Sequence, residues 1–157
     1  MVIYSKLKRV KTFQTGGKSK YVWLLENNIV KKAYNLKDKK QQIRFNNEVK
    51  YFQHVEYCDI VPKILHIDST NGILYMTYVG KVPKDTKDNR KWLAKTMKEL
   101  HLKWNLKRHR NGKPNYDVYI GNGCVLNDKM YVIDFGSFHY QISGPKIIPQ
   151  TNSNSKD

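Results

Sequence analysis

Residues 115–136 read NYDVYIGNGCVLNDKMYVIDFG, and they are the most informative segment of the chain. Asp117 is followed five positions later by Asn122, and Asp134 comes twelve positions after Asn122. Two β-rich runs separated by a turn lie between Asn122 and Asp134, so we expect a hairpin that gathers the three residues at one rim. Carboxylate and amide oxygens bind hard cations, and phosphoryl transfer needs a carboxylate that orients the acceptor hydroxyl. The segment therefore predicts a magnesium-nucleotide phosphotransfer site.

The N-terminal half, residues 1–80, is predicted to be a β-sheet with one helix. Residues 2–34 contain three β-rich runs broken by turns, which favours three antiparallel strands. Residues 38–57 carry apolar side chains at helical spacing and predict an amphipathic helix. Residues 64–67 and 73–79 predict two more strands, joined by a hairpin turn that contains Asn-Gly.

The C-terminal half, residues 81–149, is predicted to be smaller. After a polar linker, residues 88–106 place large apolar side chains on one face and predict a second helix. Residues 107–114 are predicted to be a basic loop, and the hairpin that ends at Asp134 follows it. The polar residues 150–157 are predicted to be a flexible tail.

Charge is the most unusual feature of the composition. The chain has 29 basic and 13 acidic residues and a formal net charge of +16, which suits a polyanionic partner such as nucleic acid. However, the lysines are spread through every segment, and abundant lysine and asparagine are also typical of the AT-rich genomes of many viruses. A solvated basic surface explains most of this charge, and nucleic-acid binding stays open as an alternative.

The remaining composition predicts a soluble protein without a nitrogen- or sulfur-ligated metal. The sequence has no apolar run of the roughly 20 residues that a membrane span needs, so we predict a cytoplasmic protein, in the host cell cytoplasm if viral. Cys58 and Cys124 are far apart and form no paired metal-binding motif. Both are expected to be reduced and buried.

The segment 115–136 resembles the catalytic region of the protein-kinase-like superfamily. In that family an Asp is followed five residues later by Asn and about a dozen residues after that by Asp-Phe-Gly. The resemblance implies that Asp117 is the catalytic base and that Asn122 and Asp134 bind magnesium, with ATP and Mg²⁺ as cofactors. The simpler alternative is that Asp117 and Asn122 cap loops by bonding to nearby backbone amides.

The N-terminal half adds to this resemblance. The family has an ATP-phosphate lysine on its third strand, paired with a glutamate on the next helix. Lys31 and Glu48 fit these positions, and Lys32 is the alternative because adjacent strand residues face opposite sides of a sheet. The simpler alternative is that Lys31 is a solvated strand residue and that Glu48 pairs with Arg44 on the helix surface.

Two more contacts with ATP are implied by the resemblance. Backbone groups from Met76 to Gly80, those of Met76 and Tyr78 among them, would contact the adenine edge. Gly16 and Gly17, in the turn Thr-Gly-Gly-Lys-Ser, would approach the phosphates, although this turn is not the family's Gly-x-Gly-x-x-Gly.

The sequence also departs from the family in ways that bear on function. Tyr116 stands where protein kinases have an Arg before the catalytic Asp. Residues 109–114 imitate a catalytic loop with Asn111 in place of the base, but the spacing to Asp134 is too long for that interpretation. Only 21 residues follow Gly136, too few for the usual substrate platform, so either a partner supplies the platform, the substrate is small or transfer has been lost. Of these we expect a protein substrate or a partner that supplies the platform.

Together these observations predict an α+β protein with a reduced two-lobed kinase-like fold. The lobes would be an antiparallel sheet with one helix and a truncated C-terminal lobe. The predicted function is an ATP- and magnesium-dependent phosphotransferase, a kinase whose acceptor is a protein Ser/Thr hydroxyl. The alternatives are a pseudokinase that acts as a scaffold and a basic nucleic-acid-binding module.

Overall fold

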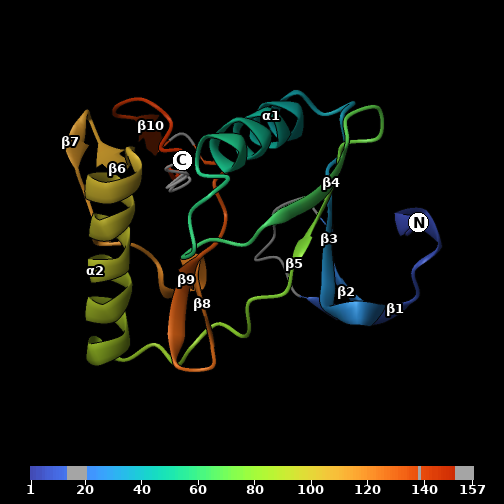
Figure 1. Ribbon diagram of the computed structural model, residues 1–157, viewed down its shortest axis with the longest axis horizontal. Coiled ribbons are helices and arrows are strands. Elements are labelled where there is room, and N and C mark those ends of the chain that lie inside the picture. The colour runs from blue at the N-terminus through green and yellow to red at the C-terminus, as the bar shows by residue number, and fades with distance from the viewer. Residues whose placement is uncertain (14–20, 138, 151–157) are drawn as a thin grey trace, which may run out of the picture.

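The computed structural model describes residues 1–13, 21–137 and 139–150. Its N-terminal part is an antiparallel sheet with the strand order β1-β2-β3-β5-β4 (Figure 1). The five strands are β1 (Arg9–Phe13), β2 (Tyr21–Leu25), β3 (Ile29–Ala33), β4 (Ile64–Asp68) and β5 (Ile73–Thr77), with short 3-10 turns at Tyr4–Lys6 and Glu26–Asn28. Strand β3 is the central strand of this sheet and pairs with β2 along one edge and with β5 along the other.

One helix, α1 (Lys39–His54), follows the first three strands. The carboxylate of Asp38 begins it by accepting from the amides of Lys40 and Gln41 at 2.9 and 3.4 Å. The apolar stripe is buried as its helical spacing requires, with Phe45 and Phe52 at 4% and 2% exposure. The helix ends three residues before the predicted position 57, because Val55 leaves helical geometry.

The C-terminal part is built on the helix α2 (Lys87–Trp104), which Thr86 caps and which ends at Asn105 in the left-handed conformation. Its buried face includes Leu93, Met97 and Leu100. The remaining elements are β6 (Leu106–Arg110), β7 (Lys113–Pro114), a 3-10 turn η3 (Ile120–Asn122), β8 (Gly123–Leu126), β9 (Lys129–Val132) and β10 (Tyr140–Ile142). The hairpin β8–β9 confirms the predicted strands near residues 124–133.

The predicted basic loop over residues 107–114 is wrong, because most of these residues belong to a hairpin. Strand β6 pairs with β7 on one side and with β10 on the other. The turn between β6 and β7 consists of Asn111 and Gly112, both with positive φ, 54° and 81°. Asn-Gly is the preferred dipeptide for such a tight hairpin turn, so a signal for it was present in the sequence.

Several hydrogen-bonded junctions hold the two parts together, and two of them involve β8 and β10. At the first, the connection after β5 packs against β8: the amides of Lys81 and Val125 each donate to the other's carbonyl, at 3.3 and 2.8 Å. A Cβ at Gly80 would lie 1.9 Å from the Val125 carbonyl oxygen, so only glycine allows this approach. At the second, the Tyr51 hydroxyl of α1 donates to the Tyr140 carbonyl of β10 at 2.8 Å.

These elements form the α+β, reduced two-lobed arrangement that the sequence predicts. Figure 1 shows the five-stranded sheet at one end, α2 with β6 and β7 at the other, and α1 and the β8–β9 hairpin between them. Within the described ranges, no helix combines the length and the apolar character needed to cross a membrane. Most of the predicted tail, residues 151–157, lies outside the described residues.

Candidate active site

A buried carboxylate joins the two parts of the molecule. Glu48 of α1 is fully buried, and its Oε1 accepts from the Lys32 Nζ at 2.8 Å and from the Tyr34 hydroxyl at 2.9 Å. Its Oε2 accepts from the backbone amide of Phe135 at 3.1 Å. The residue before that amide is Asp134. One side chain therefore ties β3 and α1 to the segment that carries the predicted metal ligand.

Lys32 is held in its charged form. Burial by itself lowers the pKa of this amine, but the nearby carboxylates of Glu48 and Asp134 outweigh burial, and the pKa lies above its ordinary value. Such a group contributes stability in full below its unfolded pKa and loses it only as the pH rises through the higher folded pKa. At neutral pH the site therefore contains a positive charge close to Asp134.

The prediction that Lys31 pairs with Glu48 is wrong, and the alternative residue Lys32 forms this ion pair. The Lys31 ammonium instead lies over the rings of Trp23 and Tyr75, 5.2 and 6.0 Å from their centroids. Successive residues of a strand face opposite sides, so only one of the two lysines can face α1. The alternative that Glu48 is an exposed helix charge is also wrong, because the side chain is fully buried.

The segment from Asp134 to Gly136 has an unusual backbone conformation and packs closely on α1. Asp134 has φ 75°, a left-handed conformation that is uncommon for residues other than glycine and is often found at functional sites. Its Oδ1 accepts from the Gly136 amide at 3.4 Å. A Cβ on Gly136 would lie 3.4 Å from the Arg44 carbonyl oxygen and 3.5 Å from the Glu48 Cγ, so this segment packs closely on α1.

The base of the β8–β9 hairpin brings Asn122 close to Asp134 along the backbone. The Ile133 amide donates to the Asn122 carbonyl at 2.9 Å, and the adjacent register pairs Gly123 with Val132. Asn122 is half-buried at the end of η3. Two of the three residues singled out from the sequence thus lie at the same end of one hairpin, as its strand spacing predicts.

Asp117 lies in the loop between β7 and η3, and its side chain is exposed. Its amide donates to the Asn115 Oδ1 at 3.0 Å, and the Asn115 amide donates to the Arg108 carbonyl of β6 at 2.9 Å. Asn115 is therefore the residue that caps this loop, and it anchors Asp117 to the β6–β7 hairpin. The role of Asp117 as a catalytic base stays a prediction.

The predicted adenine contacts fall at the end of β5. Met76 is buried and paired with Val30 of β3 and Ile64 of β4. The Tyr78 amide donates to the Asn28 carbonyl at 3.1 Å, so this amide already has a partner within the sheet region. The predicted phosphate contacts Gly16 and Gly17 lie outside the described residues.

Three participants near the site were missed by sequence reasoning. The Tyr34 hydroxyl is the second donor to the Glu48 Oε1, and the Phe135 amide is the donor to its other oxygen. Burial of Cys124 in β8 raises the pKa of its thiol to about 11. The nearby positive charge of Lys32 acts in the opposite direction and lowers this pKa. Tyr34 lies two positions after Lys32, a spacing that favours the same side of an extended chain and could have identified it.

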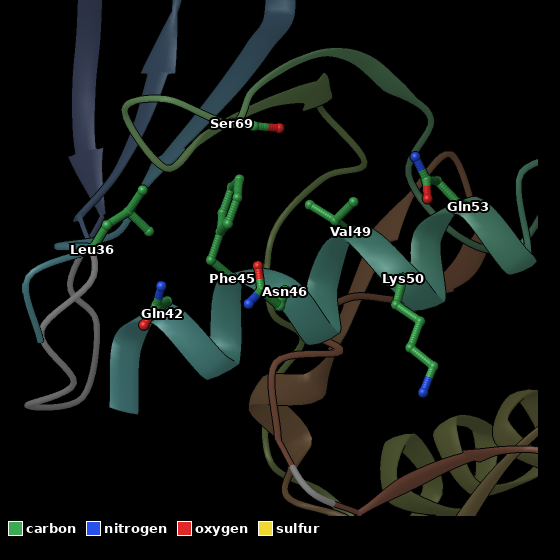
Figure 2. A pocket seen from close by; sticks show the side chains of 8 residues that line it. All are labelled: Leu36, Gln42, Phe45, Asn46, Val49, Lys50, Gln53 and Ser69. Carbon is green, nitrogen blue, oxygen red and sulfur yellow. The ribbon is translucent and has the colours of Figure 1, made fainter. Parts of the chain in front are cut away.

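A separate pocket lies on another side of α1 (Figure 2). It has a volume of about 350 Å³ and is lined mainly by α1, with Leu36 and Ser69 from the neighbouring loops. Leu36, Phe45 and Val49 form its apolar part, and none of its lining residues has a carboxylate. This pocket is distinct from the Glu48 site.

In the described part of the chain, no group of three or more His, Cys, Asp or Glu side chains is placed to hold a metal ion.

Comparison with known proteins supports the fold and nothing finer. No family model matches the chain, and no curated protein matches it. Solved structures do match, and one of them is the crystal structure of WbdD, with a TM-score of 0.60 and 17% sequence identity. The match covers 87% of this chain and 34% of that chain, so this protein spans about a third of the length of WbdD.

These comparisons correct one prediction. The assignment of the chain to the protein-kinase-like superfamily, as a minimal member of viral type, is contradicted, because no family model matches and a structural likeness at 17% identity shows the fold alone. The physical reason is that the resemblance depended on a few polar residues at fixed spacing. Such a pattern constrains one hairpin and its loop, whereas a family is defined by most positions of the chain.

Proposed function

We propose that this protein is a magnesium- and ATP-dependent phosphotransferase whose acceptor is a protein Ser/Thr hydroxyl. The observation that carries the proposal is the hydrogen-bonded cluster around Glu48, which connects Lys32 to the backbone next to Asp134. A buried ion pair contributes little net stability, because desolvation of both charges offsets their attraction. Perturbed, buried charges of this kind concentrate at functional sites, and this pair supports a catalytic use.

The proposed roles follow from the charges. Lys32, with its raised pKa, would bind ATP phosphate oxygens while Glu48 holds its ammonium in place. The Asp134 carboxylate and the Asn122 amide would supply oxygen ligands to Mg²⁺. The exposed Asp117 would orient the acceptor hydroxyl. Most of the catalysis would come from positioning and charge neutralisation, as is general for phosphoryl transfer.

The acceptor is proposed to be brought by another macromolecule. A protein substrate or a partner would supply the surface on which the acceptor hydroxyl is held. We further propose that the protein acts in the cytoplasm, where Mg²⁺ and ATP are plentiful.

The test is transfer of labelled γ-phosphate from ATP, with Mg²⁺ present, to proteins of a cell lysate. We expect Asp134→Asn to lower product formation at least a hundredfold, because one negatively charged metal ligand is lost. Asparagine is chosen because it tolerates the left-handed backbone at this position. Asp88→Asn, at an exposed position in the first turn of α2, is the matched control and should keep full turnover.

Two results would contradict the proposal. Turnover that is unchanged in Asp134→Asn would reject the site. Thermal stabilisation by Mg-ATP without any labelled product would indicate a nucleotide-binding protein that does not transfer phosphate.

For Asp117→Asn we expect that nucleotide binding is kept and that transfer is lost.

A further inference from the structure

The outer face of the five-stranded sheet carries a row of rings and cations that the proposed phosphotransfer does not use. The strand register places Trp23 of β2 opposite Lys31 of β3, Lys31 opposite Tyr75 of β5, and Tyr75 opposite His66 of β4. These four residues therefore form a straight line across four strands. We call this line, together with Arg9, Tyr4 and Tyr21, the aromatic row.

The side chains of the aromatic row contact one another. The Arg9 guanidinium lies 4.7 Å from the Trp23 ring centroid, and the Tyr21 ring is stacked on Trp23 at 5.6 Å and 10°. At the other end, the Tyr4 ring is stacked on His66 at 5.3 Å and 1°. Two cations, Arg9 and Lys31, therefore lie against the Trp23 ring within a row that otherwise consists of rings, on the side of the sheet opposite to Lys32.

The ends of the row are open to solvent. Tyr21 is 62% exposed, and Arg9 and His66 are also exposed, whereas Tyr75 in the middle is buried. Exposed lysines at positions 6, 8 and 11 lie on the adjoining N-terminal segment and β1. Within residues 1–13, 21–137 and 139–150, none of the ion pairs involves Arg9, Lys31 or these three lysines. These cations therefore form no ion pair within the described residues, although the Glu26 carboxylate lies beside them and accepts from the Lys8 amide at 3.0 Å.

We propose that the aromatic row binds single-stranded nucleic acid. Surfaces that bind single strands without strong sequence preference combine cations that follow the phosphates with aromatic rings on which bases stack. This face offers both, and the net charge of +16 favours a polyanion. An acidic peptide would use the cations but not the rings, and a duplex keeps its base faces stacked internally. Of these three ligands, only a single strand with unpaired bases would use both the cations and the rings.

The test is fluorescence anisotropy of a labelled 20-nucleotide polyuridine RNA, with the full chain and without ATP or Mg²⁺. These conditions make the result independent of the proposed phosphotransfer. We expect binding at about 50 mM salt that weakens log-linearly as salt rises, with a slope of about 0.7 for each phosphate contacted. Tyr21→Ala should weaken binding about fivefold or more, the lower end of the loss for one stacked base.

Two further variants locate the surface. Arg9→Gln should lower the salt slope by about 0.7, the value for one phosphate contact on a single strand. Arg110→Gln is the matched control, because this exposed arginine lies on the β6–β7 hairpin and takes part in none of the ring contacts described. It should bind the RNA within twofold of the unaltered protein.

Several outcomes would overturn the proposal. The first is an absence of RNA binding at low salt. The second is a Tyr21→Ala variant that binds like the unaltered protein, and the third is a loss in Arg110→Gln as large as in Arg9→Gln. Finally, displacement of the RNA by polyglutamate as effective as that by unlabelled polyuridine of equal charge would show that charge alone is recognised and would favour an acidic protein.

Discussion

The two faces of strand β3 put adjacent lysines in opposite environments. Lys32 is buried, with its ammonium 2.8 Å from the Glu48 carboxylate, whereas Lys31 is partly exposed and lies over aromatic rings. The side chains are chemically identical, so the difference comes only from what packs on each face. On the inner face the Lys32 charge depends on nearby carboxylates in a low dielectric, whereas on the outer face the Lys31 charge keeps contact with water. The inner face should therefore respond far more strongly to mutation.

The largest effect is expected from Glu48→Ala. The change leaves the Lys32 charge buried without its partner, and breaking a buried pair in this way costs about 3–5 kcal/mol. The free energy of unfolding in urea should fall by that amount. The matched control is Glu99→Ala, which breaks the surface pair with Lys103 and should cost at most about 1 kcal/mol. Equal losses in the two variants would mean that the inner face has no special energetic role.

A smaller effect is expected from Tyr34→Phe. The ring stays in place, but the hydroxyl that donates to the Glu48 carboxylate at 2.9 Å is lost. A hydrogen bond to a charged group contributes about 1.5–3 kcal/mol, so the urea midpoint should fall with little change in its slope. Tyr21→Phe on the outer face serves as the control and should leave the midpoint nearly unchanged. A Tyr34→Phe variant as stable as the unaltered protein would show that this hydroxyl is not needed to hold Glu48.

The smallest effect is expected from Lys31→Met. Cation–π contacts at exposed sites contribute about 0.5–1 kcal/mol, and methionine retains most of the apolar stem. The free energy of unfolding should therefore change by less than about 1 kcal/mol, and turnover of ATP should be unaffected. Lys32→Met is the comparison, and it should abolish turnover. If Lys31→Met lost turnover and Lys32→Met kept it, the assignment of the two faces would be reversed.

Much of the fold could be read from patterns along the chain. The apolar spacing of residues 38–57 predicts a helix that differs from α1 by a few residues at its C-terminal end. The β8–β9 hairpin matches its predicted strands within one residue. These elements follow from periodicity and turn chemistry, which act locally. The β6–β7 hairpin was missed, although its Asn-Gly turn gave a signal, because its strands are short and strongly basic.

Less of the candidate site could be predicted. The spacing of Asn122 and Asp134 indicates that one hairpin brings them close, and the backbone bond at Ile133 agrees with this. The choice between Lys31 and Lys32 could not be made, because the apolar alternation of β3 is irregular: its buried positions are Ile29 and Lys32. The Phe135 amide as a partner of Glu48 could not be anticipated either, since the two are 87 positions apart.

The sequence by itself determined both helices, the strands of the N-terminal sheet and of the β8–β9 hairpin, the α+β class and the short list of polar residues, because local spacing along the backbone controls each of these. Only the tertiary structure decided which lysine faces Glu48, how the carboxylate reaches the segment after Asp134, and that Lys31 joins a row of rings on the other face. These outcomes depend on strand register and on the packing of α1 against distant segments. Neither has a signature in any short stretch of residues.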